Sequence, residues 1–139
     1  MRLLGDDIRK RVLEALGDMD APVELVLVAS SGADTEEVAA LLEEVAEITD
    51  KLSTVRITPE EAAAQDLRPA LTPAVYIRRS GERAARFYFA GAPAGYEFGT
   101  LIEDIVDVSR GGNGLSEETR AFLGALAEPV VLQVFTTPT

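Results

Sequence analysis

The segment that most constrains the fold is residues 23–38, where an apolar run passes through a short polar turn into a helical pattern. Residues 23–29 are largely apolar and rich in valine, as in a buried strand. The residues that follow the turn repeat apolar side chains at helical spacing. A helix N-terminus after a strand offers free N–H groups and a positive dipole end, and α/β proteins often place their chemistry there. The turn at residues 30–35 is therefore the first candidate for function.

The rest of the chain continues the alternation of helices and strands. We expect Asp34 to be the N-cap of the second helix, with Glu37 completing a capping box. Thr58 is the expected N-cap of a short third helix, with Pro59 at its first position. The predicted elements are, in order, helix 6–17, strand 23–29, helix 34–48, strand 51–57, helix 58–67, strands 73–77 and 83–90, and helix 98–108.

The order of these elements predicts an α/β fold. The first strand–helix–strand unit is a parallel crossover. Residues 80–81, Ser-Gly, separate the last two strands at hairpin spacing, so we expect that pair to be antiparallel. The result is a four-stranded mixed sheet flanked by helices.

The C-terminal region resembles the beginning of a second unit. Residues 111–114, Gly-Gly-Asn-Gly, are typical of a linker, and Ser116 is the expected N-cap of a further helix. Residues 130–135 then form a strand pattern. Residues 21–28 and 128–135 share a Pro followed by an apolar run, which indicates an internal repeat that stops after one helix and one strand. We therefore divide the chain into a first unit, 1–110, and a linker with the start of a second unit, 111–139.

The composition excludes several classes of function. The chain carries 24 acidic and 13 basic residues, for a net charge of −11, so we expect no nucleic acid and no membrane surface as partner. It contains no histidine and no cysteine. Imidazole catalysis, thiol chemistry and nearly all zinc and iron sites are therefore closed to these residues, and we expect no cofactor and no metal.

The expected cellular location follows from two features that the sequence lacks, a membrane-spanning segment and a signal peptide. No apolar run approaches the ~20 residues that span a bilayer. The N-terminus is charged and has no signal-peptide core. We expect a cytoplasmic protein.

Three stretches resemble one family in detail: residues 45–53, residues 89–98 and residues 101–110. They are similar to the glutaredoxin-like protein disulfide oxidoreductases, which are built of two tandem thioredoxin folds. The N-terminal domain of the alkyl hydroperoxide reductase flavoprotein is a close relative in architecture. The resemblance implies a thioredoxin-like fold, and residues 135–139 resemble the lead-in to the second unit's Cys-Pro-x-Cys.

The resemblance also implies where a redox site belongs. In the family the first unit's Cys-x-x-Cys begins the helix after the first strand, and both thiols are missing here. Thr35 has a hydroxyl without a base, so we expect no catalytic residue in this chain. The matching positions are Gly32, Ala33, Asp34 and Thr35 for the vacated motif, and Thr72 and Pro73 for the family's cis-proline.

Three functions remain open at this point. The first is a redox-inactive module that scaffolds a redox protein, or binds a protein or extended peptide in the groove between the vacated motif and the cis-proline. The second is the N-terminal part of an active thiol–disulfide oxidoreductase or peroxide-reducing system, whose Cys-Pro-x-Cys lies beyond Thr139. The third is a stand-alone interaction module that forms a homo-oligomer, a dimer, through residues 130–135, since an unpaired apolar strand exposes an edge.

Overall fold

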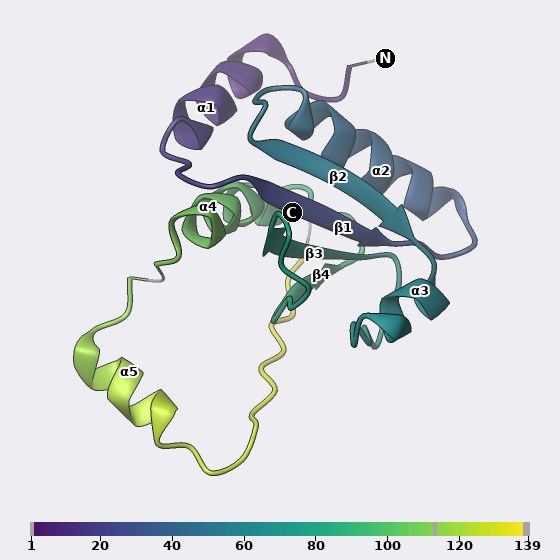
Figure 1. Ribbon diagram of the computed structural model, residues 1–139. Helices are drawn as coiled ribbons and strands as arrows, with labels where there is room; N and C mark the ends of the chain where they lie inside the picture. Colours follow the sequence, from purple (N-terminus) through teal and green to yellow (C-terminus); the bar gives the residue numbers. More distant parts are fainter. Residues whose placement is uncertain (1, 113, 138–139) are drawn as a thin grey trace.

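The computed structural model describes residues 2–112 and 114–137, and it contains one mixed sheet with helices on both faces (Figure 1). The elements are α1 (Asp6–Leu16), β1 (Val23–Val28), α2 (Ala33–Ala46), β2 (Leu52–Ile57), α3 (Pro59–Ala64), β3 (Ala74–Arg79), β4 (Tyr88–Ala90), α4 (Tyr96–Arg110) and α5 (Glu117–Gly124). The predicted α/β class and the mixed four-stranded sheet are confirmed.

The sheet has the strand order β2-β1-β3-β4. β1 pairs with β2 in parallel and with β3 antiparallel, and β3 pairs with β4 antiparallel. The parallel pair is joined by the crossover helix α2, and the hairpin between β3 and β4 turns through Gly81 at φ 86°. Both connections agree with the prediction.

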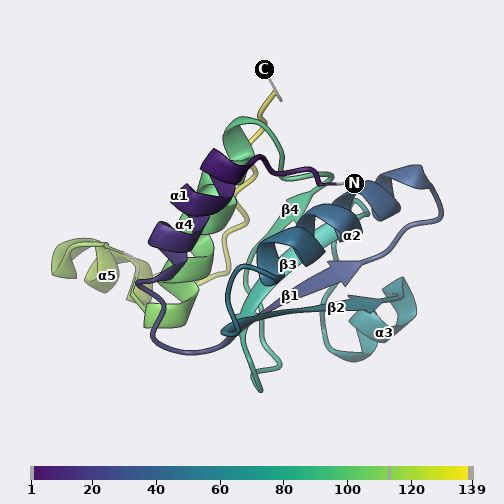
Figure 2. The same cartoon turned by 90° about the horizontal axis from the view of Figure 1, so that it is seen from above.

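Alternation along β1 divides the core between two layers. Val23, Leu25 and Leu27 face a cluster formed with α1, α2 and α4, whereas Val26 and Val28 face a smaller cluster under α3. Figure 2 shows α1 and α4 lying side by side over the sheet. In the described part of the chain no helix combines the length and apolarity needed to cross a bilayer.

The end of α4 is fastened to the sheet by side chains. The Arg79 guanidinium donates from Nε to the Val108 carbonyl at 3.0 Å and from Nη2 to the Ser109 carbonyl at 2.9 Å. The buried Ser109 hydroxyl donates to the Ala21 carbonyl at 2.6 Å and accepts from the Ala21 N–H at 2.9 Å. The chain leaves α4 through Gly111, whose φ of 72° is left-handed.

The two largest errors in the predicted boundaries within the first 110 residues are at β4 and α3. The strand predicted at 83–90 covers only β4, because Arg83 is engaged elsewhere: its carbonyl accepts from Arg78 and its guanidinium donates to the Ala64 carbonyl. The helix predicted to end near Leu67 ends at Ala64, where the chain turns through Asp66 at φ 60°.

The predicted strand at 130–135 is not formed. In the described part of the region beyond α4, α5 is the helix expected after the Ser116 cap, and residues 125–137 have no strand assignment. A strand needs a neighbour for its backbone hydrogen bonds, and the described chain pairs none with this segment. The segment extends from α5 back toward the body of the molecule (Figure 1). The division of the chain at residue 110 stays a prediction.

Candidate functional site at one end of the sheet

Two segments that the sequence marks as functional, the turn after β1 and Thr72–Pro73, meet the loop after β4 at one end of the sheet. Val28, the last residue of β1, pairs with Ala74, the first of β3, and Ala74 pairs with Ala90, the last of β4. The turn after β1, the residues before β3 and the loop after β4 therefore share this end. The Gly91 N–H donates to the Pro73 carbonyl at 2.8 Å and ties two of them together. We call residues 30–35, 72–73 and 91–95 the sheet-end site.

The turn from β1 to α2 is held by the Thr35 side chain. Thr35 is fully buried, and its hydroxyl accepts from the Ser30 N–H at 3.0 Å and donates to the Ser30 carbonyl at 2.9 Å. The Ser30 hydroxyl lies 3.1 Å from the same oxygen. Thr35 is thus committed to shaping the turn, and its hydroxyl is not available to a ligand.

The prediction of Asp34 as an N-cap is wrong. α2 begins at Ala33, its N-cap is Gly32, and no side chain caps it. Asp34 instead lies exposed in the first turn, where a carboxylate still interacts favourably with the helix dipole. The helix begins earlier than the capping pattern predicted because Thr35 anchors the turn from inside.

The other side of the site is the segment before β3. The Thr72–Pro73 peptide bond is cis; Pro73 is buried and Thr72 is exposed. The segment is positioned by Tyr88 of β4, whose hydroxyl accepts from the Ala70 N–H at 3.0 Å. This role was not predicted, since Tyr88 and Ala70 lie far apart in sequence and only the hairpin brings them together.

Tyr88 is itself held by an aromatic neighbour. Its ring centroid lies 5.0 Å from that of Tyr76, at an interplanar angle of 43°. Burial raises the pKa of the Tyr76 hydroxyl, and the nearby Tyr88 adds to the effect. Both tyrosines therefore support the site from within the sheet.

The site offers backbone and small side chains rather than reactive groups. Gly32, Ala33 and Thr72 are exposed. The whole chain contains neither cysteine nor histidine, so thiol–disulfide exchange and imidazole catalysis are closed to it. Among the described residues no cluster of acidic side chains has the arrangement of a metal site.

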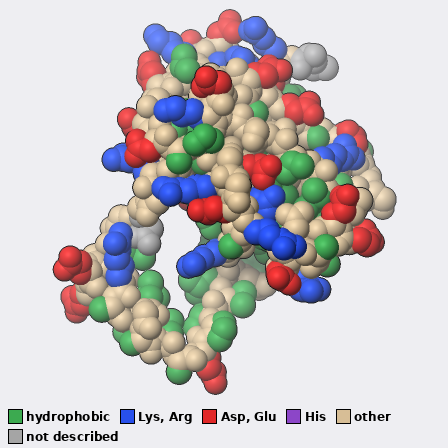
Figure 3. Space-filling view, viewed as in Figure 1, with side chains coloured by type: hydrophobic (Ala, Val, Ile, Leu, Met, Phe, Trp, Pro, Cys, Tyr) green, Lys and Arg blue, Asp and Glu red, His purple; other side chains and the backbone are tan. Residues whose placement is uncertain are grey.

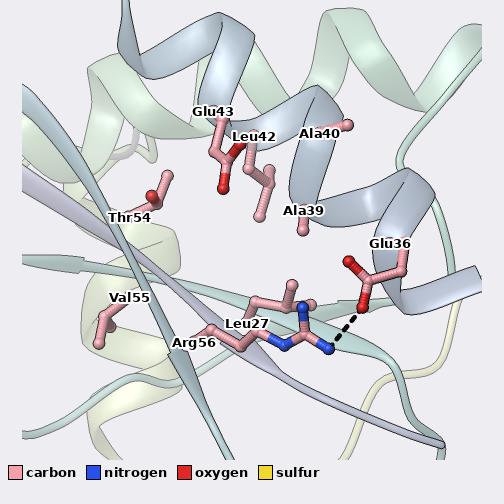
Figure 4. A pocket seen from close by; sticks show the side chains of 9 residues that line it. All are labelled: Leu27, Glu36, Ala39, Ala40, Leu42, Glu43, Thr54, Val55 and Arg56. Atoms are coloured by element: carbon pink, nitrogen blue, oxygen red, sulfur yellow. Dashed lines mark hydrogen bonds and ion pairs between the residues drawn. The ribbon is translucent and has the colours of Figure 1, made fainter.

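A separate hollow lies between α2 and β2 (Figure 4). It has a volume of about 170 Å³, and across it Arg56 donates to Glu36 at 2.7 Å. This hydrogen bond and the charge of Arg56 lower the pKa of the Glu36 carboxyl. Its lining residues are Leu27, Glu36, Ala39, Ala40, Leu42, Glu43, Thr54, Val55 and Arg56. It is distinct from the sheet-end site.

Comparison with known proteins gives the fold and its relatives. No family model matches the chain. The alkyl hydroperoxide reductase AhpF of Staphylococcus epidermidis is 31% identical over 107 residues, which cover 77% of this chain and 19% of that protein. The Staphylococcus aureus protein of the same name is 29% identical over the same length.

Comparison with solved structures gives relatives of the same kind. The NTD_N/C domain of alkylhydroperoxide reductase AhpF from Enterococcus faecalis superposes with a TM-score of 0.72 at 19% identity, over 90% of this chain and 62% of that one. A protein disulfide oxidoreductase from Aeropyrum pernix gives a TM-score of 0.72 at 22% identity, over 91% and 56%.

This chain is a thioredoxin-fold relative of the N-terminal region of alkyl hydroperoxide reductase AhpF. The predicted resemblance is confirmed. The chain contains no cysteine. It spans 19% of the length of the curated relatives it matches, so their activity as whole proteins is not assigned to it.

Proposed function

We propose that this chain is a redox-inactive thioredoxin-fold module that binds an extended segment of a partner protein at the sheet-end site. The observation that carries the proposal is the convergence of residues 32–35 with Thr72 and Pro73 in a chain without cysteine. The family resemblance assigns these positions to a dithiol site, and the chain supplies no thiol for it. Recognition is the function that such a surface still supports.

The surface has the properties that an extended peptide requires. Gly32, Ala33 and Thr72 are small or short and exposed, so the backbone around them is accessible for main-chain hydrogen bonds. Leu71, beside Thr72, is 67% exposed, and Tyr96, just after the loop 91–95, is 79% exposed. These two apolar side chains offer contacts for the side chains of a bound segment.

The binding test uses S-carboxymethylated insulin B chain, an extended polypeptide whose thiols are blocked. Titrated into the full chain, it is expected to shift the backbone amide resonances of residues 30–35, 72–74 and 91–95. Ala33→Glu should weaken binding by placing a charge in the site. Ala40→Glu adds the same charge to the same helix outside the site and is the matched control. Shifts confined to other surfaces, or equal affinity in both variants, would contradict the proposal.

The proposed redox inactivity of the chain, and the assignment of residues 32–35 to the dithiol positions, have a separate test. The pure chain should give no reduction of insulin disulfides above background. Gly32→Cys/Thr35→Cys should form an intramolecular disulfide if these are the dithiol positions, and an added Cβ at Gly32 meets no atom within 4 Å, so the new side chain fits there. A thiol at this helix N-terminus should titrate below its usual pKa of about 8.5. A double variant that stays fully reduced under air oxidation would show that these are not the dithiol positions.

A second function is favoured by the comparison with AhpF. We propose as the alternative that this chain is the N-terminal part of an active thiol–disulfide oxidoreductase or peroxide-reducing system, with its Cys-Pro-x-Cys beyond Thr139. The repeat of residues 21–28 in 128–135 supports this proposal. The codons that follow Thr139 test it: a Cys-x-x-Cys is expected within the first few, and its absence contradicts the alternative without touching the binding proposal.

A further inference from the structure

The negative charge of the chain is concentrated on two segments. Residues 29–50, which contain α2, carry seven acidic and no basic side chains, and residues 87–109, which contain α4, carry four acidic and no basic ones. These eleven charges equal the net charge of −11, because the other residues carry 13 acidic and 13 basic side chains. The charge is therefore distributed unevenly along the chain.

Both acidic helices begin at the sheet-end site. α2 follows Val28, and α4 follows the loop after Ala90, and these two residues lie at the same end of the sheet. α4 finishes at the opposite end, where the guanidinium of Arg79, the last residue of β3, donates to its final carbonyls. Side chains of both helices pack into one core cluster, so the two helices cover the same face of the sheet.

The carboxylates nearest the site are not neutralised by cations. Asp34 and Glu37 are exposed and Glu97 is half-buried, and none of them forms an ion pair with another described residue. Glu36 differs, since Arg56 donates to it at 2.7 Å. Asp34 and Glu37 are three residues apart on α2 and therefore lie side by side on its surface. One edge of the site is thus a pair of unpaired carboxylates.

The basic side chains lie at the other end of the sheet. Arg79 pairs with Val23, the first residue of β1, so the hairpin between β3 and β4 turns at the end opposite the site. Figure 3 shows Lys and Arg side chains gathered over the middle of the visible face, where this hairpin lies in Figure 1. The hairpin carries four arginines against one glutamate: Arg78, Arg79, Arg83, Arg86 and Glu82. A segment bound at the sheet-end site therefore lies in the negative part of the protein's field.

We infer that the extended segment bound at the sheet-end site is basic, with Lys or Arg side chains that lie beside Asp34 and Glu37. The inference rests on the proposed function and adds the chemical class of the partner. Opposite charges across an interface favour the correct partner and speed its encounter, whereas an acidic segment is repelled at the same position. The apolar contacts offered by Leu71 and Tyr96 are common to both kinds of segment, so charge makes the selection.

The test compares three forms of insulin B chain that differ only in the group blocking the cysteines. The S-aminoethyl group is positive, the S-carbamidomethyl group is neutral and the S-carboxymethyl group is negative. Each form is titrated into the full chain, and binding is followed through the amide resonances of residues 30–35. The affinity should fall in that order, by about ten-fold from first to last at low ionic strength. The differences should shrink in concentrated salt, which screens exposed charges.

A pair of double variants locates the charge preference. Asp34→Asn/Glu37→Gln removes two carboxylates beside the site and should bring the affinities for the three forms to within about two-fold of one another. Asp18→Asn/Glu82→Gln removes the same charge from exposed positions at the opposite end of the sheet and is the matched control. It should keep the wild-type order. All four side chains are exposed, so far-UV circular dichroism should be unchanged in both variants.

The outcomes separate this inference from the proposed function. Equal affinities for the three forms, or the reverse order, would overturn the inference and leave peptide binding at the sheet-end site intact. Binding of none of the forms would overturn both. If Asp34→Asn/Glu37→Gln kept the full wild-type preference, the inference would also be wrong, because the selection would then come from another surface.

Discussion

Residues 22–28 and 129–135 have the same sequence pattern and different structures. Each begins with proline and continues as an apolar run, with Leu25 and Leu132 at equivalent positions. Leu25 is fully buried in a strand with neighbours on both sides, whereas Leu132 is 88% exposed and belongs to no strand. The comparison shows that the pattern specifies a preference, and that pairing partners decide whether a strand forms.

The largest expected difference between the two regions is at these equivalent leucines. Leu25→Ala should lower the free energy of unfolding by ~2–5 kcal/mol, because it removes a fully buried side chain and leaves a cavity. Leu132→Ala should change it by less than ~0.5 kcal/mol in the monomer. Urea unfolding at a protein concentration below any association measures both. Equal losses of unfolding free energy in the two variants would mean that Leu132 is packed as tightly as Leu25.

A smaller effect is expected at the boundary between the two regions. Gly111→Ala should cost ~1–2 kcal/mol, because φ is 72° there and an added Cβ would lie 2.7 Å from Nη2 of Arg79. Arg79 would have to move and would lose its bond to the Ser109 carbonyl. Gly112→Ala, with no atom within 4 Å of its Cβ position, is the control and should be nearly neutral. Thermal unfolding followed by circular dichroism compares the two.

A smaller difference is expected between the N-caps of α3 and α5, which stabilise one helix in the sheet-containing region and one helix beyond α4. Thr58 caps α3 in a full capping box, and Ser116 caps α5 by accepting from the Thr119 N–H at 3.2 Å. Thr58→Ala should lower the stability of the body by ~1 kcal/mol. Ser116→Ala should reduce the helical population of α5 and leave global unfolding unchanged, since α5 has no buried residue. Amide exchange read residue by residue separates these outcomes, and a global loss in Ser116→Ala would show that α5 is part of the cooperative unit.

These contrasts explain how far the sequence predicts the structure. The N-cap at Thr58 was predicted correctly because capping involves residues within one turn. The strand predicted at 23–29 was found for a similar reason, since its apolar, valine-rich composition is a local property. The strand predicted at 83–90 was wrong because Arg83 is drawn to Arg78 and Ala64, contacts that arise only once the sheet has formed.

In the candidate site, too, contacts between residues that are distant in sequence were not predicted. The resemblance placed residues 32–35 and Thr72–Pro73 together, and strand pairing brings both segments to one end of the sheet. The groups that hold the site were not predicted. Thr35 was assigned to a vacated motif, and only the folded turn shows that its hydroxyl bonds to Ser30. Tyr88 lies within the strand predicted at 83–90, and its bond to Ala70 depends on the hairpin.

The N-terminal segment is attached to α2 by a carboxylate. The Glu44 carboxylate accepts from the N–H groups of Leu3 and Leu4 at 2.6 and 2.7 Å. Burial raises the pKa of this carboxyl, but the two hydrogen bonds and the nearby positive charges together outweigh burial, and its pKa is lowered overall. The arginines at positions 2 and 9 act in the same direction. The charged form of Glu44 therefore holds the N-terminal segment against α2.

The smallest expected effect is the pH dependence of this contact. Because the pKa of Glu44 is lower in the folded chain than in the unfolded one, its contribution to stability is fully present above the unfolded value of ~4.3 and is lost as pH falls through the folded value. Glu44→Gln should remove that part of the acid-induced loss, measured as the difference in urea midpoint between the variant and the wild type from neutral to acidic pH. Glu47→Gln, just after the same helix, has no such hydrogen bonds among those described and is the control. If the two variants lose stability in parallel with the wild type, the carboxylate does not hold the segment.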